Sequence, residues 1–299
     1  MSASTVAPPS ARPPAPRRHG KPRPSLPQIL LWILVSIILI YLVFPVFVVV
    51  PVSFSSAKYL QFPPPGWSLQ WYQNYFERPG WVPATWVSIR VAIVTAILAT
   101  TLGTAASLAL VRGKFPGKAA VNSFMVSPLV VPAIIVAIGI YFVYAQFRLV
   151  GNQLGLILAH TALALPFVVT NVSATLQGFD ERLEYAAMNL GANRWQTFWR
   201  VTLPIIRPGV FAGALFAFIT SFDELIVALF ISGSGAVTLP RKMWDSLRQE
   251  IDPTIAAVST VLILVSIVIL FSAELLRQRS ERARSVDWAR VDEDLGAVQ

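Results

Sequence analysis

Long stretches without a charged side chain dominate this sequence and limit what it can fold into. About 20 apolar residues in a helix cross the ~30 Å hydrocarbon core of a bilayer, and a helix satisfies its own backbone hydrogen bonds there. Six stretches reach this length, and only one of them is interrupted, by Asp223 and Glu224: Ile29–Ala57, Val91–Val111, Ala119–Phe147, Leu149–Phe179, Pro208–Pro240 and Pro253–Ala273. The sequence therefore predicts an all-α integral membrane protein with six transmembrane helices.

The basic residues are distributed unevenly between these spans. The chain has 24 Lys and Arg against 15 Asp and Glu, a net charge of +9. Five basic residues precede the first span, three lie between the second and third, four lie between the fourth and fifth, and five follow the sixth. The other seven fall on the opposite side. Because cytoplasmic loops are enriched in Lys and Arg, both termini are predicted to be cytoplasmic, and the positive charge is interpreted as topology and not as a nucleic-acid surface.

Composition divides the chain into segments. Residues 1–28 are rich in Pro and Arg and are predicted to be a disordered cytoplasmic tail, because they bury too little apolar surface to fold. Residues 29–57 form the first span, an uncleaved anchor whose apolar run exceeds the ~7–15 residues of a signal peptide. An external loop (58–83), a core of five spans (84–277) and a second cytoplasmic tail (278–299) follow. The external loop is aromatic, which favours a position at the membrane interface over a docking surface for an external partner.

The segment 178–208, between the fourth and fifth spans, is amphipathic although the charge pattern places it in the cytoplasm. Asp180, Glu181 and Glu184 lie in the first turns of a predicted short helix, where acidic side chains complement the helix dipole. Gly191 is suited to ending this helix in a left-handed conformation. The segment therefore begins as a helix followed by a glycine turn.

A second helix is predicted directly after this turn. Asn193 and Gln196 have the spacing of a capping box at its start, and Leu203-Pro204 is expected to end it. One apolar stripe at helical spacing consists of Trp195, Phe198, Trp199 and Thr202. A helix–turn–helix element with bulky apolar side chains fits a groove of another protein; the alternative is a hairpin that lies on the lipid surface.

The same segment resembles a motif of known transport proteins. Tyr185-Ala186-Ala187 is followed after three residues by Gly191 and after nine more by Val201-Thr202-Leu203-Pro204. This pattern resembles the EAA loop of binding-protein-dependent ABC importer permeases, with Tyr185 at the position of the family's Glu and Glu184 one residue earlier. The resemblance implies a type I importer fold whose coupling loop inserts into a cleft of an ATPase. The residues implied in this coupling are Glu184, Tyr185, Ala186, Ala187, Gly191, Ala192, Trp195, Leu203 and Pro204.

The resemblance also implies partners. Two permeases, the second expected to be a different chain, would pair across a pore in the bacterial inner membrane. Two ATPase subunits and a periplasmic or extracellular substrate-binding protein would complete the assembly. This chain has no G-x-x-x-x-G-K-[ST] phosphate loop, so ATP and Mg²⁺ are expected on the partner ATPases. No cofactor, metal ligand or catalytic residue is expected in this chain, which is not predicted to be an enzyme.

Asp223 and Glu224 are the acidic residues inside a predicted span. Because buried charges in membranes are costly, such residues indicate function by default, although they can also pair internally, for example with Arg90. The run from Ser221 to Leu225 resembles the S-L-D-D motif of polyamine permeases, whereas anion permeases of the superfamily have S-L-G-E-F. Ser221, Asp223 and Glu224 are therefore candidates for the substrate pathway of a polyamine-like cation. His160, a lone histidine in the fourth span, is interpreted as a hydrogen-bonded packing residue.

Two alternatives stay open at this point. The same machine could carry another small organic solute, such as an amino-acid-like compound or an opine. An ion-coupled secondary transporter would use Asp223 and Glu224 as proton sites, but it leaves the loop around Gly191 unexplained.

Overall fold

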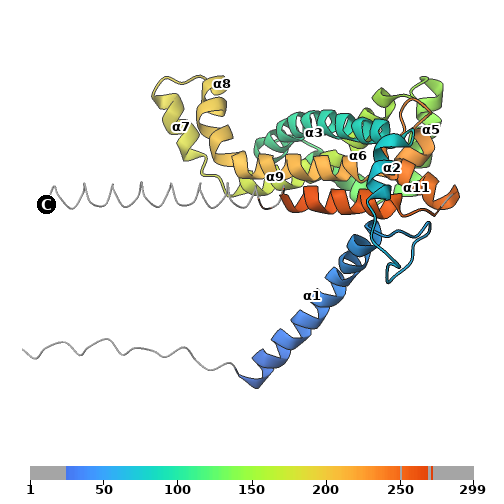
Figure 1. The fold of residues 1–299 in the computed structure, drawn as a ribbon. Coiled ribbons are helices and arrows are strands. Elements are labelled where there is room, and N and C mark those ends of the chain that lie inside the picture. The colour runs from blue at the N-terminus through green and yellow to red at the C-terminus, as the bar shows by residue number, and fades with distance from the viewer. Residues whose placement is uncertain (1–24, 250, 269–270, 272–299) are drawn as a thin grey trace, which may run out of the picture. The chain divides into compact units, whose positions relative to one another are not determined.

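A computed structural model describes residues 25–249, 251–268 and 271 of the chain (Figure 1). The described residues form helices and connecting segments, with one isolated β-bridge between Ser55 and Trp67. The predicted all-α class is confirmed over this part of the chain. The helices are α1 (Leu26–Ser53), α2 (Gln70–Glu77), α3 (Trp81–Arg112), α4 (Lys118–Val126), η1 (Ser127–Leu129), α5 (Ala133–Gln146), α6 (Gln153–Gln177), α7 (Arg182–Asn189), α8 (Arg194–Thr197), η2 (Phe198–Thr202), α9 (Leu203–Phe222), α10 (Ile226–Ile231), α11 (Leu239–Gln249) and Thr254–Val268.

Four of these helical segments are long and apolar enough to cross a membrane: α1, α3, α6 and the continuous run Arg194–Phe222. A fifth arises if Lys118–Leu129 and Ala133–Gln146 count as one span, which is bent by 104°. The bend lies before Pro132, and proline both lacks a backbone donor and disfavours a helical conformation in the preceding residue. Thr254–Val268 is a shorter apolar helix. The described residues thus contain four or five candidate spans by this measure, where the sequence predicts six.

The chain divides into two units, which are described separately. The first ends at Val48 and contains most of α1, a helix of exposed apolar side chains without a charge. α1 begins at Leu26, so residues 26–28, assigned to the tail by composition, are helical. Ser25 and Gln28 meet at this end, where the backbone amide of Ser25 donates to the Gln28 side chain at 2.9 Å.

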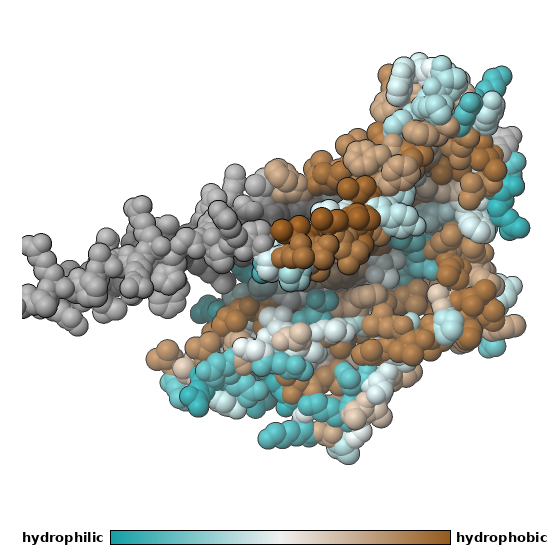
Figure 2. All heavy atoms as spheres, turned by 90° about the horizontal axis from the view of Figure 1, so that it is seen from below, coloured by the Kyte–Doolittle hydropathy of each residue, from teal (hydrophilic) through white to brown (hydrophobic). Residues whose placement is uncertain are grey.

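The second unit begins at Val49 and is built on α3, α6 and α9, which pack against one another. Their shared core contains small and β-branched residues, among them Ala99, Ala164, Val168 and Ala217. Close packing depends on Gly103 of α3, because a Cβ there would lie 2.7 Å from the Val168 side chain of α6. Small residues at such crossings let membrane helices approach closely. The outer faces remain apolar, and Figure 2 shows broad hydrophobic areas on the side that it displays.

The two ends of this unit differ in character. α7 and α8 form a hairpin at one end, whereas α2, α5 and α11 lie at the other (Figure 1). α9 runs from the hairpin along the unit, and α3 runs beside it. The hairpin therefore lies at one end of the helical bundle.

Candidate functional site

The hairpin begins as the sequence predicts, with α7 held at both ends by local contacts. The Asp180 side chain accepts a hydrogen bond from the Arg182 backbone amide at 2.9 Å. After α7 the chain turns at Gly191, whose φ is +94°. A Cβ at this position would meet no atom within 4 Å, so the left-handed backbone conformation and not lack of space favours glycine. The predicted glycine turn is confirmed.

The predicted capping box after the turn is also confirmed. The backbone amide of Gln196 donates to Asn193 Oδ1 at 2.8 Å, and the backbone amide of Asn193 donates to Gln196 Oε1 at 3.0 Å. Both side chains therefore satisfy donors that the start of α8 leaves free. These contacts fix the direction in which the second helix leaves the turn.

The end of the second helix differs from the prediction. Leu203-Pro204 does not end it, because the chain continues through the π-helical turn η2 into α9. Pro204 lies in the first turn of α9, directly after the π-helical turn, where proline supplies no backbone donor. The hairpin is therefore joined to α9 without a loop.

The π-helical turn also divides the predicted apolar stripe. Trp195 and Trp199 are 68% and 51% exposed, with their ring centroids 5.6 Å apart, whereas Thr202 is buried. A π turn contains an extra residue relative to an α-helical turn, so the residues after it are rotated about the helix axis. The expectation that Thr202 shares the face of the two tryptophans is therefore wrong.

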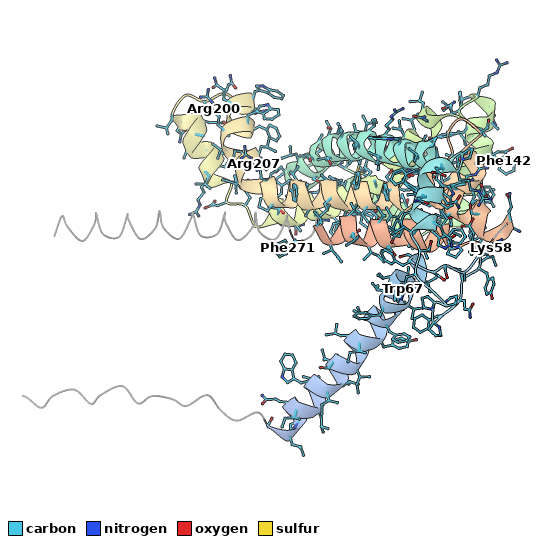
Figure 3. All side chains as sticks on the ribbon, in the orientation of Figure 1. Lys58, Trp67, Phe142, Arg200, Arg207 and Phe271 are labelled. Atoms are coloured by element: carbon cyan, nitrogen blue, oxygen red, sulfur yellow. The ribbon has the colours of Figure 1, made fainter. Side chains whose placement is uncertain are left out.

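Most of the predicted coupling residues lie on the surface of the hairpin. Tyr185 is 59% exposed, Ala186 and Gly191 are exposed, and Ala187 and Ala192 are half-buried. Leu203 and Pro204 are half-buried at the base. Leu190, directly after α7, is 90% exposed, although it is not among the predicted coupling residues. Figure 3 shows Arg200 and Arg207 at this end of the unit, so the apolar surface has basic neighbours.

Glu184 differs from the other coupling candidates because its carboxylate faces the helical body. Its Oε2 lies 2.6 Å from Nη1 of Arg112, the last residue of α3. Its Oε1 accepts a hydrogen bond from the Thr202 hydroxyl. Arg112 is not among the predicted site residues, because it lies 72 positions before Glu184. In the sequence, only its basic charge at the end of an apolar stretch marks it.

The substrate-pathway candidates lie at a break in the predicted fifth span. α9 ends at Phe222 and α10 begins at Ile226, so the stretch Pro208–Pro240 is not one continuous helix. The Glu224 carboxylate accepts hydrogen bonds from the backbone amides of Val227 at 2.8 Å and Ala228 at 3.0 Å. A side chain that binds the backbone donors of the next turn stabilises the start of a new helix there.

Ser221 and Glu224 also contact the buried histidine of α6. Nδ1 of His160 forms a hydrogen bond of 2.9 Å with the Ser221 hydroxyl, and Nε2 lies 3.6 Å from Oε2 of Glu224. The interpretation of His160 as a packing residue is confirmed. Glu224 thus lies beside His160, and its hydrogen bonds among the described residues go to the backbone at the start of α10 and not to Arg90.

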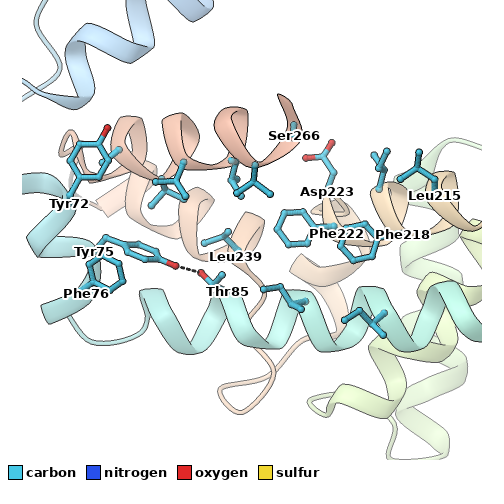
Figure 4. A pocket seen from close by; sticks show the side chains of 18 residues that line it. Tyr72, Tyr75, Phe76, Thr85, Leu215, Phe218, Phe222, Asp223, Leu239 and Ser266 are labelled. Carbon is cyan, nitrogen blue, oxygen red and sulfur yellow. Dashed lines mark hydrogen bonds between the residues drawn. The ribbon is translucent and has the colours of Figure 1, made fainter. Parts of the chain in front are cut away.

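Asp223 is oriented differently from its neighbour. It lines a cavity of about 570 Å³ between α3, α9 and the helix Thr254–Val268, with α2 at one end. It is the charged residue among the described residues that line this cavity, whose walls are otherwise mainly aliphatic and aromatic. In Figure 4, Asp223 lies with Phe218 and Phe222 toward one end and Tyr72, Tyr75 and Phe76 lie toward the other. The structure therefore separates Asp223 from Ser221 and Glu224.

Comparisons with known proteins agree with this architecture. Residues 99–286 match the family described as binding-protein-dependent transport system inner membrane component. The chain is 33% identical over 258 residues to the putrescine transport system permease protein PotI of Escherichia coli K12, covering 84% of this chain and 92% of that protein. It is 31% identical over 244 residues to the spermidine/putrescine transport system permease protein PotC of Haemophilus influenzae Rd, covering 80% of this chain and 93% of that protein.

A solved structure shares the fold. The crystal structure of a bacterial ABC transporter involved in the import of the acidic polysaccharide alginate superposes with a TM-score of 0.64 at 14% identity, covering 86% of this chain and 99% of that chain. The family match and the identity to two permeases over most of their length also agree with the apolar helices described above. The chain therefore belongs to the family of binding-protein-dependent transport system inner membrane components, and it is a multi-pass ABC importer permease.

Proposed function

We propose that this chain forms half of the translocation pathway of an ATP-driven importer for a small, polyamine-like organic cation. The observation that carries the choice of cargo is Asp223, a carboxylate in an otherwise apolar and aromatic cavity. Two relatives of this chain, a putrescine permease and a spermidine/putrescine permease, point in the same direction.

The cavity suits a cation with an alkyl chain. At an effective dielectric constant near 20, a carboxylate and an ammonium group about 4 Å apart attract each other by roughly 4 kcal/mol. Aromatic faces such as those of Phe218 and Phe222 add cation–π attraction. Aliphatic walls such as Ile89 and Leu262 offer contact for methylene groups. In this proposal Asp223 contacts cargo. Ser221 and Glu224 hold the helices beside the pathway, through their contacts with His160 and with the start of α10.

The proposed topology has six spans with both termini in the cytoplasm. The spans are α1, α3, the bent pair α4–α5, α6, the run from α9 to α10 with its break at Asp223, and the helix from Thr254. The hairpin then lies in the cytoplasm between the fourth and fifth spans, as the positive-inside rule favours. Lys58 and Phe142 lie at the opposite end of the unit from Arg200 and Arg207 (Figure 3), which supports opposite sides for these segments. The tails 1–28 and 278–299 lie almost wholly outside the described residues.

The hairpin is proposed to insert into a cleft of a partner ATPase. Leu190, Trp195 and Trp199 are large apolar side chains at its surface, and tryptophan is enriched among residues that dominate binding energy. The assembly comprises two ATPase subunits, which bind ATP and Mg²⁺, a second permease and an external binding protein. This chain supplies the pathway and the mechanical contact, not the hydrolysis.

Uptake into proteoliposomes tests the cargo. The complete transporter is reconstituted with internal ATP and assayed with labelled putrescine, comparing the wild type with Asp223→Asn. The variant is expected to lose roughly tenfold in uptake rate, since at least ~1.4 kcal/mol of attraction disappears. Glu77→Gln, which removes the same charge from an exposed position on α2, is the matched control.

Two results of this assay would contradict the proposal. Equal uptake by the wild type and Asp223→Asn would remove Asp223 from the pathway. Competition by an excess of amino-acid-like compounds or opines, with none by putrescine or spermidine, would assign the machine to another small organic solute.

A further inference from the structure

One carboxylate of the hairpin joins three segments that are distant in the sequence. Glu184 of α7 forms an ion pair with Arg112, at the end of α3, with 2.6 Å between Oε2 and Nη1. The same carboxylate accepts a hydrogen bond from Thr202, the last residue of the π-helical turn η2. α7, α3 and the start of α9 therefore meet at Glu184.

The surroundings make this contact stronger than an ordinary surface pair. The side chains of Arg112 and Glu184 are only 24% and 15% exposed, and the Arg112 guanidinium lies 5.3 Å from the centroid of the Phe179 ring. Water therefore screens the pair less than it screens an exposed one. Nη2 of Arg112 is buried without a hydrogen-bond partner among the described residues, so the salt bridge to Glu184 is the contact that compensates this buried charge.

The neighbours of Glu184 face away from this contact. Tyr185 and Ala186 are exposed on the outer surface of α7. Successive residues of an α-helix are separated by about 100° around its axis, so residues 184 and 185 cannot both face the helical body. Glu184 is thus turned toward α3, while Tyr185 is turned toward the surface proposed to meet the ATPase.

The π-helical turn η2 lies between the hairpin and α9, so it affects how a movement of the hairpin reaches α9. A π-helical segment interrupts regular helical hydrogen bonding and often occurs at functional sites. Force applied at Trp195 reaches α9 through η2, and flexing of η2 would absorb part of it. Glu184 holds the last residue of η2 and also attaches α7 to α3, so it supports the turn from outside.

We propose that Glu184 is a positioning residue that makes the hairpin move together with α3 and α9. The inference rests on the proposed function, in which an ATPase moves the hairpin. The cluster of Arg112, Glu184, Thr202 and Phe179, which we call the clamp, transmits this movement to the bundle. Glu184 contributes to transport without contacting cargo or nucleotide.

The test uses the complete transporter in lipid nanodiscs. Glu184→Gln keeps the size of the side chain and an acceptor for Thr202 but removes the ion pair, and Arg112→Gln removes it from the other side. Both are expected to lower binding-protein-stimulated ATP hydrolysis and uptake about tenfold, within the usual range of coupling between sites, while the ATPase subunits still co-purify in full amount. Glu181→Gln, an exposed acid one turn earlier on the hairpin, is the matched control and should behave as the wild type.

A charge exchange separates the clamp from simple loss of stability. The double variant Arg112→Glu with Glu184→Arg restores opposite charges and is expected to recover at least half of the stimulated ATP hydrolysis. The chain has no cysteine, so probes can be placed at exposed Lys114, just after α3, and Asn189, near the end of α7. Spin labels at these two sites are expected to give a broader distance distribution in Glu184→Gln than in the wild type.

Each contrary outcome has a separate meaning. Normal coupling and an unchanged distance distribution in Glu184→Gln would refute the clamp while the hairpin could still dock. Loss of ATPase co-purification in Glu184→Gln would show Glu184 to be a docking contact instead, which also overturns the inference. Failure of the proposed function would appear in the wild type itself, as transport that needs neither ATP nor the partner ATPase.

Discussion

Nε2 of His160 in α6 lies 3.6 Å from Oε2 of Glu224, beside the break between α9 and α10, and Nδ1 of the same ring is hydrogen-bonded to Ser221 near the end of α9. On its other side the Glu224 carboxylate binds the backbone amides of Val227 and Ala228. Asp223, one residue earlier, lines the cavity. The two adjacent acidic residues therefore have different surroundings. Glu224 lies at the helix joint, which is the break between α9 and α10, and Asp223 lies on the cavity wall.

Substitutions at the two acids are expected to have different effects on stability. Glu224→Ala removes the acceptor for two backbone donors, which costs about 1 kcal/mol, as loss of a helix cap does, and it lowers the midpoint of thermal unfolding. Asp223→Ala is expected to leave this midpoint unchanged. Thermal unfolding in detergent compares them, and Glu224→Gln, which keeps one acceptor oxygen, should fall between Glu224→Ala and the wild type. Equal midpoints for Glu224→Ala and Asp223→Ala would contradict the assignment of the joint to Glu224.

The turn at Gly191 should be sensitive to backbone conformation rather than to volume. Gly191→Val places a β-branched residue at a positive φ, which costs roughly 1–2 kcal/mol, and is expected to abolish ATP-coupled uptake while membrane insertion stays intact. Gly191→Asn is the control, because Asn tolerates the left-handed region. Uptake assays and membrane fractionation check both variants. Full uptake by Gly191→Val would mean that the turn does not need its observed geometry.

The exposed tryptophans of the hairpin segment, Trp195 and Trp199, are expected to contribute most to ATPase binding. Trp195→Ala should weaken binding of the ATPase subunit by about 2 kcal/mol or more, as truncation of a central anchor does, which corresponds to at least about 30-fold in affinity. Affinity is measured by titrating the purified ATPase onto this chain and its partner permease in nanodiscs. Trp67→Ala, an exposed tryptophan outside the hairpin, serves as control. Equal affinities for the two variants would refute docking through Trp195.

The crossing of α3 and α6 leaves no room for a larger residue at position 103. Gly103→Val would place Cβ 2.7 Å from the Val168 side chain, and overpacking of this kind costs about 1–3 kcal/mol. The variant should unfold at a lower temperature, and Gly103→Val with Val168→Ala should recover part of the loss. Gly139→Val, at a site where an added Cβ meets nothing within 4 Å, is the matched control.

Local features of the hairpin were predictable because they depend on neighbouring residues. A glycine directly after a short helix favours a left-handed turn, and the pairing of Asn193 with Gln196 needs only a spacing of three. The apolar stretches likewise predicted the helical class, because the length of a stretch alone decides whether it can span a bilayer. These predictions needed no knowledge of distant contacts.

The features that the sequence did not reveal depend on distant residues or on competing local bonds. The pairing of Arg112 with Glu184 requires α3 and α7 to be brought together in space. The break after Phe222 arises because the Glu224 carboxylate takes backbone donors that a continuous helix would use; the pattern alone indicates that Asp223 and Glu224 are two pore acids on one span. The π-helical turn before Pro204 likewise shows no signature in apolar spacing.

The different surroundings of Asp223 and Glu224 have a consequence for how the cargo of such a permease can be altered by substitution. Because the start of α10 is bonded to Glu224 and not to Asp223, replacement of Asp223 is expected to alter what the cavity admits while these bonds stay in place. In the proposed function, the choice of cargo is therefore assigned to a residue that holds no helix in place, next to one whose carboxylate starts α10.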